Sequence, residues 1–436
     1  MSLLSTSSFD FSLRPRRLSG LLIPLALLMA LAGSAEAVKI ATAAALSEST
    51  QADEVRKGLA LDPDNAALCN RLSQLCSNSL ERSHFAEAVA LASRATALNP
   101  NKADYWLTLA SACESVGYNP CAGGALEHSL ALSPMVPSVW WMAGNQYLRA
   151  RRSEAALSCF RHLLNLSPDY AAQVFDLTLR TYGDSKVILE NIVSGVQNPS
   201  VGLAFADFLS ANDDFSTAYQ AWTQAVRRGA KFPFVSVQPY LARLLNHGRY
   251  PEAQAIWVYL ELQGIVANPA PSEQGNLVFN GGFENQPLGG GFDWNLQISP
   301  YDSVDFADSS SWEGKRCLHI EFPVGQNIDF EPVYQIVPVL STHAYDLSAY
   351  IRSSDITSDS GPRLRVTDPD CPSCLDALTD TTVGTTPWHW VTLKFTTGPQ
   401  TQAVRLSVWR PRSRTFPMDI SGGFWLDGVS ISAEKL

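Results

Sequence analysis

Aromatic side chains in the C-terminal part of the chain could bind a sugar, because pyranose rings stack on exposed aromatic planes. The candidates are Trp294, Trp388, Trp390 and Trp409. Trp409 directly precedes Arg410 and is the better surface candidate. In the stretch "WHWV", Trp388 and Trp390 are two residues apart and therefore share one face of a strand. We expect both rings to lie in the core, since a β-domain of this size needs large core residues; exposure of both is the alternative.

A pair of carboxylates could hydrolyse a glycosidic bond, and the stretch "DFEP" supplies Asp329 and Glu331. No cleft motif accompanies this pair. The sequence also lacks the G-x-S-x-G, H-E-x-x-H, Walker and dinucleotide-binding patterns. We therefore expect no enzyme, and a glycosidase acting through these two acids is a minor alternative.

The "CPSC" stretch, Cys371–Cys374, could act in redox chemistry or bind zinc. A redox C-x-x-C motif belongs at a helix start in an α/β fold, and a zinc site would need two more ligands, for which Cys317 and His319 are available. We expect a disulfide that holds a loop between strands, and two free thiols are the alternative. Most of the earlier cysteines are expected to be small buried residues: Cys69, Cys76, Cys113, Cys121 and Cys159.

The elements that carry these residues are short strands. After residue 275 the apolar residues alternate with polar ones, which is the period of a half-buried strand. The predicted strands are rich in β-branched and aromatic residues and lie at 303–308, 317–322, 333–339, 344–352, 363–368, 388–397, 403–410 and 423–432. This number of strands predicts an antiparallel β-sandwich of the jelly-roll type.

The preceding residues repeat with a helical period. Pro100, Pro134 and Pro168 are spaced by 34 residues, each after a Leu-Asn or Leu-Ser pair. A proline at this place ends the second helix of a pair and begins the next turn. The pattern predicts a solenoid of about five to six helical hairpins over residues 44–264, followed by a Pro- and Gly-containing linker at 265–275.

The repeat resembles the tetratricopeptide (TPR) consensus, in which large and small residues alternate where two helices cross. The matching residues between Trp140 and Pro168 are Ala143, Gly144, Tyr147, Ala156, Phe160 and Leu163. The resemblance implies a concave groove that binds a protein partner, with Trp141, Asn145 and Arg149 pointing into it. For Trp141 the alternative is packing against the next helix.

The C-terminal domain, residues 276–436, resembles the jelly rolls of carbohydrate-binding modules. "NLVFNGGFE" (276–284) and "FWLDGVSI" (424–431) are similar to the two closing strands of that family. The resemblance also covers "NIDFEPVYQIVPV" (327–339), as in domains that follow TPR arrays in exported bacterial proteins. It implies a β-sandwich that binds a polysaccharide.

The same family often holds a structural calcium between its first and last strands. Glu284 and Asp427 match the acidic positions, and backbone carbonyls near Lys315 would complete the oxygen shell. This chain has Gly428 where many relatives carry a second acid, so one ligand is missing. A surface carboxylate pair is the alternative.

The N-terminus has the pattern of an export segment. Three arginines at residues 14–17 precede the uncharged run Leu21–Ala32, and Ala35–Ala37 gives a small-x-small cleavage pattern. Residues 1–37 are thus either a cleaved signal peptide or an uncleaved anchor, with residues 18–35 just long enough to span a membrane. Either alternative places the remaining chain in the periplasm or at the cell surface.

Together these patterns predict a multidomain chain, an α-solenoid followed by a β-sandwich. The net charge of −10 argues against a nucleic acid or an anionic lipid surface as partner, so membrane contact is expected only through the N-terminal segment. We expect an exported adaptor without catalytic activity, with a protein partner in the TPR groove and a polysaccharide on the sandwich, in exopolysaccharide or envelope assembly. The alternative is a structural assembly protein that binds no glycan.

Overall fold

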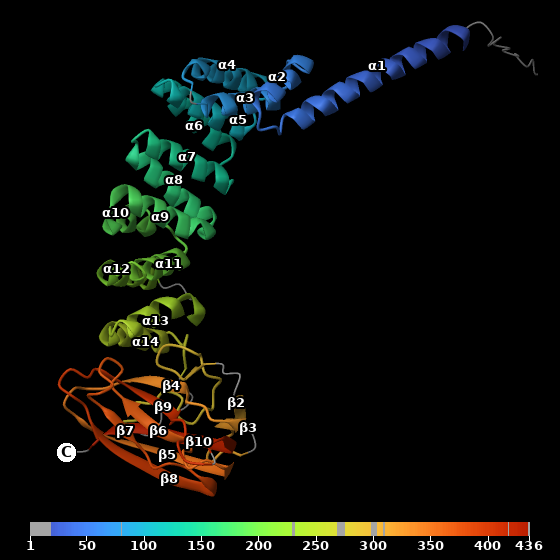
Figure 1. Cartoon of the computed structure of the whole chain (residues 1–436). Helices are drawn as coiled ribbons and strands as arrows, with labels where there is room; N and C mark the ends of the chain where they lie inside the picture. The colour runs from blue at the N-terminus through green and yellow to red at the C-terminus, as the bar shows by residue number, and fades with distance from the viewer. Residues whose placement is uncertain are drawn as a thin grey trace, which may run out of the picture. The chain divides into compact units, whose positions relative to one another are not determined.

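The computed structural model describes residues 19–79, 81–228, 232–267, 275–297, 303–307, 310–416 and 418–434. Helices precede strands along the chain, which confirms the predicted fold class (Figure 1). The last helix ends at Leu262 and the first strand begins at Asn295. The predicted arginines at residues 14–17 and most of the predicted linker, residues 268–274, lie outside the described residues.

The chain forms two compact units, residues 1–170 and 171–436. The first unit contains, in its described part, α1 (Ser19–Leu46), α2 (Ala52–Leu61), α3 (Ala66–Ser77), α4 (Ser83–Leu98), α5 (Ala103–Ser115), α6 (Asn119–Leu132), α7 (Pro137–Arg149), α8 (Ser153–Leu166) and the short 3-10 helix η1 (Pro168–Tyr170). Neighbouring helices pack as the hairpins α3–α4, α5–α6 and α7–α8. At the α7–α8 crossing, a Cβ on Gly144 would lie 2.6 Å from the Phe160 ring, so only glycine permits this close approach.

Helix α1 runs without interruption through the predicted cleavage pattern at Ala35–Ala37. Its stretch Pro24–Leu46 is long and apolar enough to cross a membrane, with a mean hydropathy of 1.5. The last turns differ from the rest because they pack on the repeat array: Ala43 is fully buried, and Leu46 lies against Gly58 of α2. The helix is compatible with both the signal-peptide and the anchor interpretations.

The second unit begins with the three hairpins α9–α10, α11–α12 and α13–α14. Their bounds are α9 (Ala171–Tyr182), α10 (Ser185–Asn191), η2 (Val193–Gly195), α11 (Pro199–Ser210), α12 (Phe215–Arg227), η3 (Phe234–Ser236), α13 (Gln238–Asn246) and α14 (Tyr250–Leu262). Trp222 and Trp257, which are 35 residues apart in the sequence, are both buried in these hairpins.

The strands of this unit form two antiparallel five-stranded sheets. They are β1 (Asn295–Leu296), β2 (Ser303–Ala307), β3 (Cys317–Gln326), β4 (Phe330–Pro338), β5 (Ala344–Ile356), β6 (Arg363–Thr367), β7 (Asp376–Leu378), β8 (Gly384–Thr396), β9 (Ala403–Arg410) and β10 (Ile420–Ala433). One sheet has the order β1-β4-β9-β6-β7, and we call it sheet A. The other has the order β2-β3-β10-β5-β8, and we call it sheet B.

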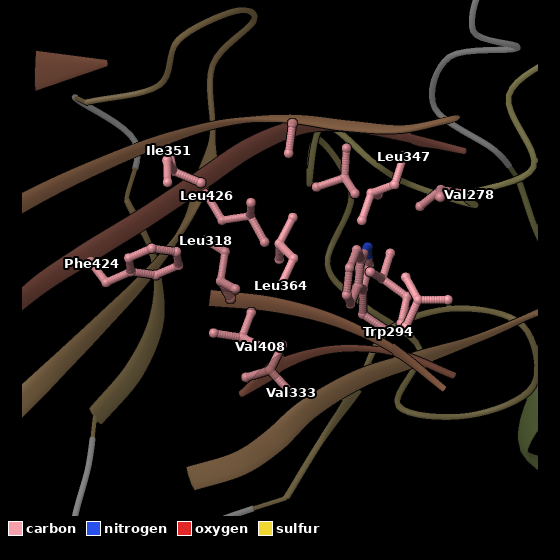
Figure 2. Close-up of a cluster of buried hydrophobic side chains, with 14 of the residues drawn as sticks. Val278, Trp294, Leu318, Val333, Leu347, Ile351, Leu364, Val408, Phe424 and Leu426 are labelled. Carbon is pink, nitrogen blue, oxygen red and sulfur yellow. The ribbon is translucent and has the colours of Figure 1, made fainter. Parts of the chain in front are cut away.

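The core lies between the two sheets because each strand turns alternate residues inward. In β5 the residues alternate between buried and half-buried over most of the strand. Figure 2 shows Val333 and Val408 of sheet A together with Leu318, Leu347 and Leu426 of sheet B in this core. These side chains are almost entirely buried, which is the main stabilising contribution of a β-sandwich.

The segment 276–284, predicted as a closing strand, forms turns instead. Its backbone enters the left-handed region at Asn280 and Phe283, with φ of 51° and 55°, which interrupts any regular strand. It nevertheless lies beside β10, since Leu277 N–H donates to Ile431 O at 2.8 Å and Val429 N–H donates to Gly281 O at 2.9 Å.

The sandwich packs directly on the last hairpin through the glycine run 289–291. Gly291 has a φ of 64°, and a Cβ there would lie 2.2 Å from the Trp257 ring of α14. The Trp257 ring also makes edge contacts with Phe279 and Phe292, at centroid distances of 5.1 and 5.8 Å. Gly290 and Gly291 therefore allow the backbone to approach the helical hairpin closely, since a Cβ on Gly290 would also lie 2.8 Å from Gln238 Nε2.

Candidate ligand-binding site

The outer face of sheet A carries a pocket of about 490 Å³, which we call the cleft. Helix α13, the loop that contains the glycine run 289–291 (the glycine loop) and the loop after β6 form its walls. Its lining residues are Gln238, Ala242, Leu245, Asn246, Tyr250, Gly289, Gly290, Gly291, Asn295, Glu331, Tyr334, Ile336, Arg365, Thr367, Pro369, Asp370, Pro372 and Arg405. The side chains are mostly polar, so the cleft suits a ligand rich in hydrogen-bonding groups.

Strand alternation places the side chains of the cleft floor. In β4, β6 and β9 alternate residues point into the core, and the residues between them, which include Tyr334, Arg365 and Arg405, point outward. Tyr334 is paired with Ser407 across β4 and β9, and Ser407 is paired with Arg365 across β9 and β6. These three outward side chains thus lie in one row across the sheet.

Charged hydrogen bonds fix the carboxylates and guanidinium groups on this floor. Arg365 forms a two-pronged ion pair with Asp376, with distances of 2.8 and 3.0 Å. The Arg365 hydrogen bond holds the pKa of Asp376 below its usual value, and burial opposes this shift. Arg365 also lies 3.6 Å from Glu331, which accepts a hydrogen bond from the Ser407 hydroxyl at 2.8 Å. Both acids are therefore held in one orientation.

Two guanidinium groups lie over aromatic rings. Arg405 stacks on Tyr334 at 3.8 Å from the ring centroid, and Arg365 stacks on Trp409 at 4.6 Å. Arg363 also lies over the Trp409 ring, at 5.4 Å from its centroid. Stacking of this kind leaves the edge of a guanidinium group free to donate hydrogen bonds while the ring fixes its plane.

The "CPSC" loop forms one wall of the cleft. Cys371 and Cys374 form a disulfide, as predicted. Asp368 holds the preceding turn by accepting the Asp370 and Cys371 N–H groups at 2.9 and 3.1 Å. Asp370 in turn is hydrogen-bonded to Tyr250, the first residue of α14, and burial together with this acid raises the pKa of the tyrosine hydroxyl. The loop is thereby fastened to the last hairpin.

The four tryptophans predicted to bind glycan lie in three different places. Trp409 is half-buried on the outer face of sheet A, beside the cleft. Trp294 is fully buried, and its indole N–H donates to Asn280 O at 3.1 Å, so its prediction as a glycan platform was wrong. Trp388 and Trp390 lie on the outer face of sheet B, so the expectation that both lie in the core was also wrong. Sheet B meets the core requirement with aliphatic residues and phenylalanine instead.

Glu284 and Asp427 lie together, as the calcium prediction requires, but their oxygens face N–H groups. Glu284 Oε1 accepts from Lys315 and Arg316 at 2.8 and 3.1 Å. Asp427 Oδ2 accepts from residues 312–313 at 2.8 and 3.1 Å. Burial, together with the nearby Glu284 charge, raises the pKa of Asp427 to about 6. Amide hydrogens thus occupy the positions where a cation would need oxygen ligands, and this arrangement does not fit calcium.

The predicted TPR groove residues lie on α7 in the first unit. Trp141 is half-buried, and its ring contacts Tyr170 at a centroid distance of 5.9 Å, which agrees with the packing alternative. Asn145 donates to the Trp141 carbonyl at 2.7 Å. Arg149 is exposed and lies 3.6 Å from Glu114 of α5, so it bridges two successive hairpins. Protein binding in this groove stays a prediction.

One disulfide was missed, because most early cysteines were expected to be small buried residues. Cys113 at the end of α5 and Cys121 at the start of α6 are bonded. Their eight-residue separation spans the turn of one hairpin, and that position was the available sequence signal. Cys69, Cys76 and Cys159 are buried as predicted, and burial raises the pKa of each thiol.

No protein-family model and no curated protein matches the chain. Among solved structures, "Crystal structure of MamA" is 15% identical and covers 41% of this chain and 86% of that one, with a TM-score of 0.26. "CBM4 structure and function" is 12% identical and covers 36% and 99%, with a TM-score of 0.28. The CBM22-1 xylan-binding domain from Paenibacillus barcinonensis Xyn10C is 15% identical and covers 38% and 99%, with a TM-score of 0.25. These neighbours are a TPR-like helical repeat and carbohydrate-binding-module β-sandwiches, and we take no ligand from them.

Proposed function

We propose that the protein is an exported adaptor without catalytic activity. In this proposal the β-sandwich binds a polysaccharide in the cleft of sheet A, and the helical repeats bind a protein partner in envelope or exopolysaccharide assembly. The rival is a structural assembly protein that binds no glycan. The observation that favours the first proposal is the set of fixed side chains on the cleft floor.

These side chains suit the hydroxyl groups of a sugar. Glu331 is held by Ser407 and offers a fixed acceptor, whereas Arg365 and Arg405 offer fixed donors at neighbouring positions. Hydrogen bonds to charged groups of this kind contribute about 1.5–3 kcal/mol each. Trp409 beside the cleft extends the aromatic surface, although Arg363 and Arg365 cover part of its ring.

We propose no catalytic role for the acids of the "DFEP" stretch. Glu331 faces two guanidinium groups, which suits a fixed acceptor better than a proton donor. Asp329 is exposed and does not line the cleft. A glycosidase mechanism would need a second acid across the scissile bond. Asp370 is the other acid of the cleft, and it is bonded to Tyr250.

The test is binding of the full chain to an array of bacterial and plant polysaccharides, with the Arg405→Ala variant beside the wild type. Loss of one charged hydrogen bond should lower the affinity roughly 10- to 100-fold. Arg414→Ala is the matched control, because Arg414 is exposed, lies in the same domain and does not line the cleft. Equal binding by Arg405→Ala and the wild type would remove the cleft from the proposal, and binding to no polysaccharide would favour the structural rival.

A further inference from the structure

The outer face of sheet B, which is not part of the cleft, carries an exposed aromatic surface. Trp312, Tyr350 and Trp390 form it, and we call it the shelf. Trp312 stacks on Tyr350 with ring centroids 4.3 Å apart and planes 18° apart. Tyr350 meets Trp390 at 4.8 Å and 70°, because the two residues are directly paired across β5 and β8.

The two tryptophans of the shelf are largely uncovered. Trp312 is 47% exposed and Trp390 is 52% exposed, and neither contributes to the core. Exposed aromatic rings gathered on one face mark a binding surface more often than scattered single residues do. Two rings of this size thus leave a large apolar area in contact with solvent.

The shelf is held in place by groups that had suggested a calcium site. The Trp312 N–H donates to Asp427 Oδ2 at 2.8 Å, which fixes the loop that carries this ring. Gly314, with φ of 68°, allows the loop to pass close to Glu284, since a Cβ there would lie 2.2 Å from Oε1. Trp388 Nε1 donates to Ser310 O at 3.1 Å, which ties the start of the same loop to β8. The rings are therefore oriented before any ligand binds.

The residues around the shelf indicate what kind of ligand it fits. Between residues 346 and 354 of β5 and between 386 and 394 of β8, the outward positions hold hydroxyl-bearing, charged and aromatic side chains, and none is aliphatic. These residues are Asp346, Ser348, Tyr350, Arg352, Ser354, Thr386, Trp388, Trp390, Thr392 and Lys394. Aromatic planes surrounded by hydroxyl groups match the apolar ring faces and polar edges of a sugar, whereas a protein-docking patch would be expected to include aliphatic contacts as well.

The two outward cations of β5 and β8, Arg352 and Lys394, already have contacts of their own, which favours a neutral sugar. Arg352 lies over the Trp425 ring at 4.8 Å from its centroid. Lys394, the outward cation on β8 that is nearest in sequence to Trp390, lies 2.6 Å from Glu434 and 3.6 Å from Asp346. Because this cation already has two acidic neighbours, it is poorly placed to select an anionic chain. Stacking and hydroxyl contacts are then the dominant interactions.

We propose that the shelf is a second carbohydrate-binding surface, which stacks on the pyranose rings of an extended neutral polysaccharide. The inference deepens the proposed function and rests on it for the general affinity for glycans. The cleft and the shelf occupy the outer faces of different sheets, so one sandwich can hold two glycan segments at once. The protein then joins polysaccharide chains in addition to recruiting them.

Affinity electrophoresis of the full chain tests the shelf, with gels containing soluble β-glucan, xylan, dextran or hydroxyethylcellulose. Some polysaccharides should retard the wild type. For at least one of these, the affinity of the Trp312→Ala/Trp390→Ala double variant should be lower than that of the wild type by about tenfold or more. Trp390→Phe keeps a ring and should bind nearly as well as the wild type. Phe416→Ala is the matched control and should behave as the wild type, because it removes a 90% exposed ring that belongs neither to the shelf nor to the cleft.

Arg405→Ala in the same gels separates the two binding surfaces. Residual retardation of Arg405→Ala that disappears when Trp312→Ala and Trp390→Ala are added to it supports two independent surfaces. If the double shelf variant is retarded as strongly as the wild type by every polysaccharide, the shelf proposal is wrong and the cleft can still stand. If only the shelf variant loses binding, the cleft proposal is wrong and the shelf stands. Absence of retardation of the wild type in all gels overturns both.

Discussion

At the scale of single residues, buried polar groups hold the loop that joins the sandwich to the last hairpin. Asp293 is 1% exposed, and it accepts the Leu288 and Trp294 N–H groups at 2.8 and 2.7 Å. Burial raises the pKa of Asp293 to about 6, against the hydrogen bonds that favour its charged form. The charged carboxylate is thus less favoured in the folded protein than in the unfolded chain.

This shift predicts a stability that falls as the pH rises. The folded-state pKa lies above the usual value of 3.8, so the contribution of Asp293 is fully present below about pH 4 and is lost as the pH rises to about 6. A shift of about two pKa units corresponds to roughly 3 kcal/mol. Denaturant unfolding from pH 4 to 7 should show the wild type losing this free energy of unfolding relative to Asp293→Asn, which does not titrate. Parallel pH curves for the two proteins would contradict the assignment.

Gly291 gives a second prediction at this scale. Gly291→Ala would place a Cβ 2.2 Å from the Trp257 ring at a φ of 64°, so both the contact and the backbone are unfavourable. We expect the free energy of unfolding to fall by about 3 kcal/mol or more. Gly289→Ala is the control: its φ is 68°, but no atom lies within 4 Å of the added Cβ, so it should cost only about 1 kcal/mol. Equal losses in the two variants would show that the contact with Trp257 is unimportant.

At the scale of elements, the sequence patterns identified the long strands. They missed the short strands, which form only because a neighbouring strand pairs with them. The eight predicted strands correspond to β2–β6 and β8–β10 in position, because each alternates over several residues. β1 and β7 contain two and three residues, which is too few to show a period. The segment 276–284 contains strand-forming residues, but its φ values above zero depend on tertiary contacts with β10.

The residues of the cleft were predictable only in part, because their positions also depend on tertiary contacts. Residue chemistry alone predicts a role for Trp409 and Glu331, whereas no local motif marks Tyr334, Arg365 or Arg405. The stretch "RLRV" has arginines at alternate positions, and in "AVRLSVWR" Arg405 alternates with Val404 and Leu406, which places these arginines on the face opposite the aliphatic residues. The alternation does not reveal that these faces are adjacent, because strand order depends on the pairing of β9 with both β4 and β6.

At the scale of the whole molecule, the apolar N-terminal helix also belongs to the first repeat. Ala43→Asp would bury a charge where α1 meets the array and should destabilise the first unit by about 3 kcal/mol or more. Ala41→Asp, at an exposed position of the same helix, should change the free energy of unfolding by less than about 0.5 kcal/mol. Limited proteolysis of the full chain in detergent micelles would report both effects. Equal protease sensitivity of the two variants would show that the last turns of α1 make no contribution. The prediction applies to the cleaved and the anchored form, because both retain residues 38–46.

The contact of Trp257 with the glycine loop restricts how this architecture can change in evolution. A solenoid normally ends in a repeat with a polar outer surface, since the last apolar face would otherwise meet water. Here the sandwich covers that face, so α13–α14 must keep a shape that matches residues 289–291 and Phe279. Duplication or loss of a hairpin is therefore tolerable only upstream of α13. Homologues should vary in the number of hairpins before this joint and keep the joint itself unchanged.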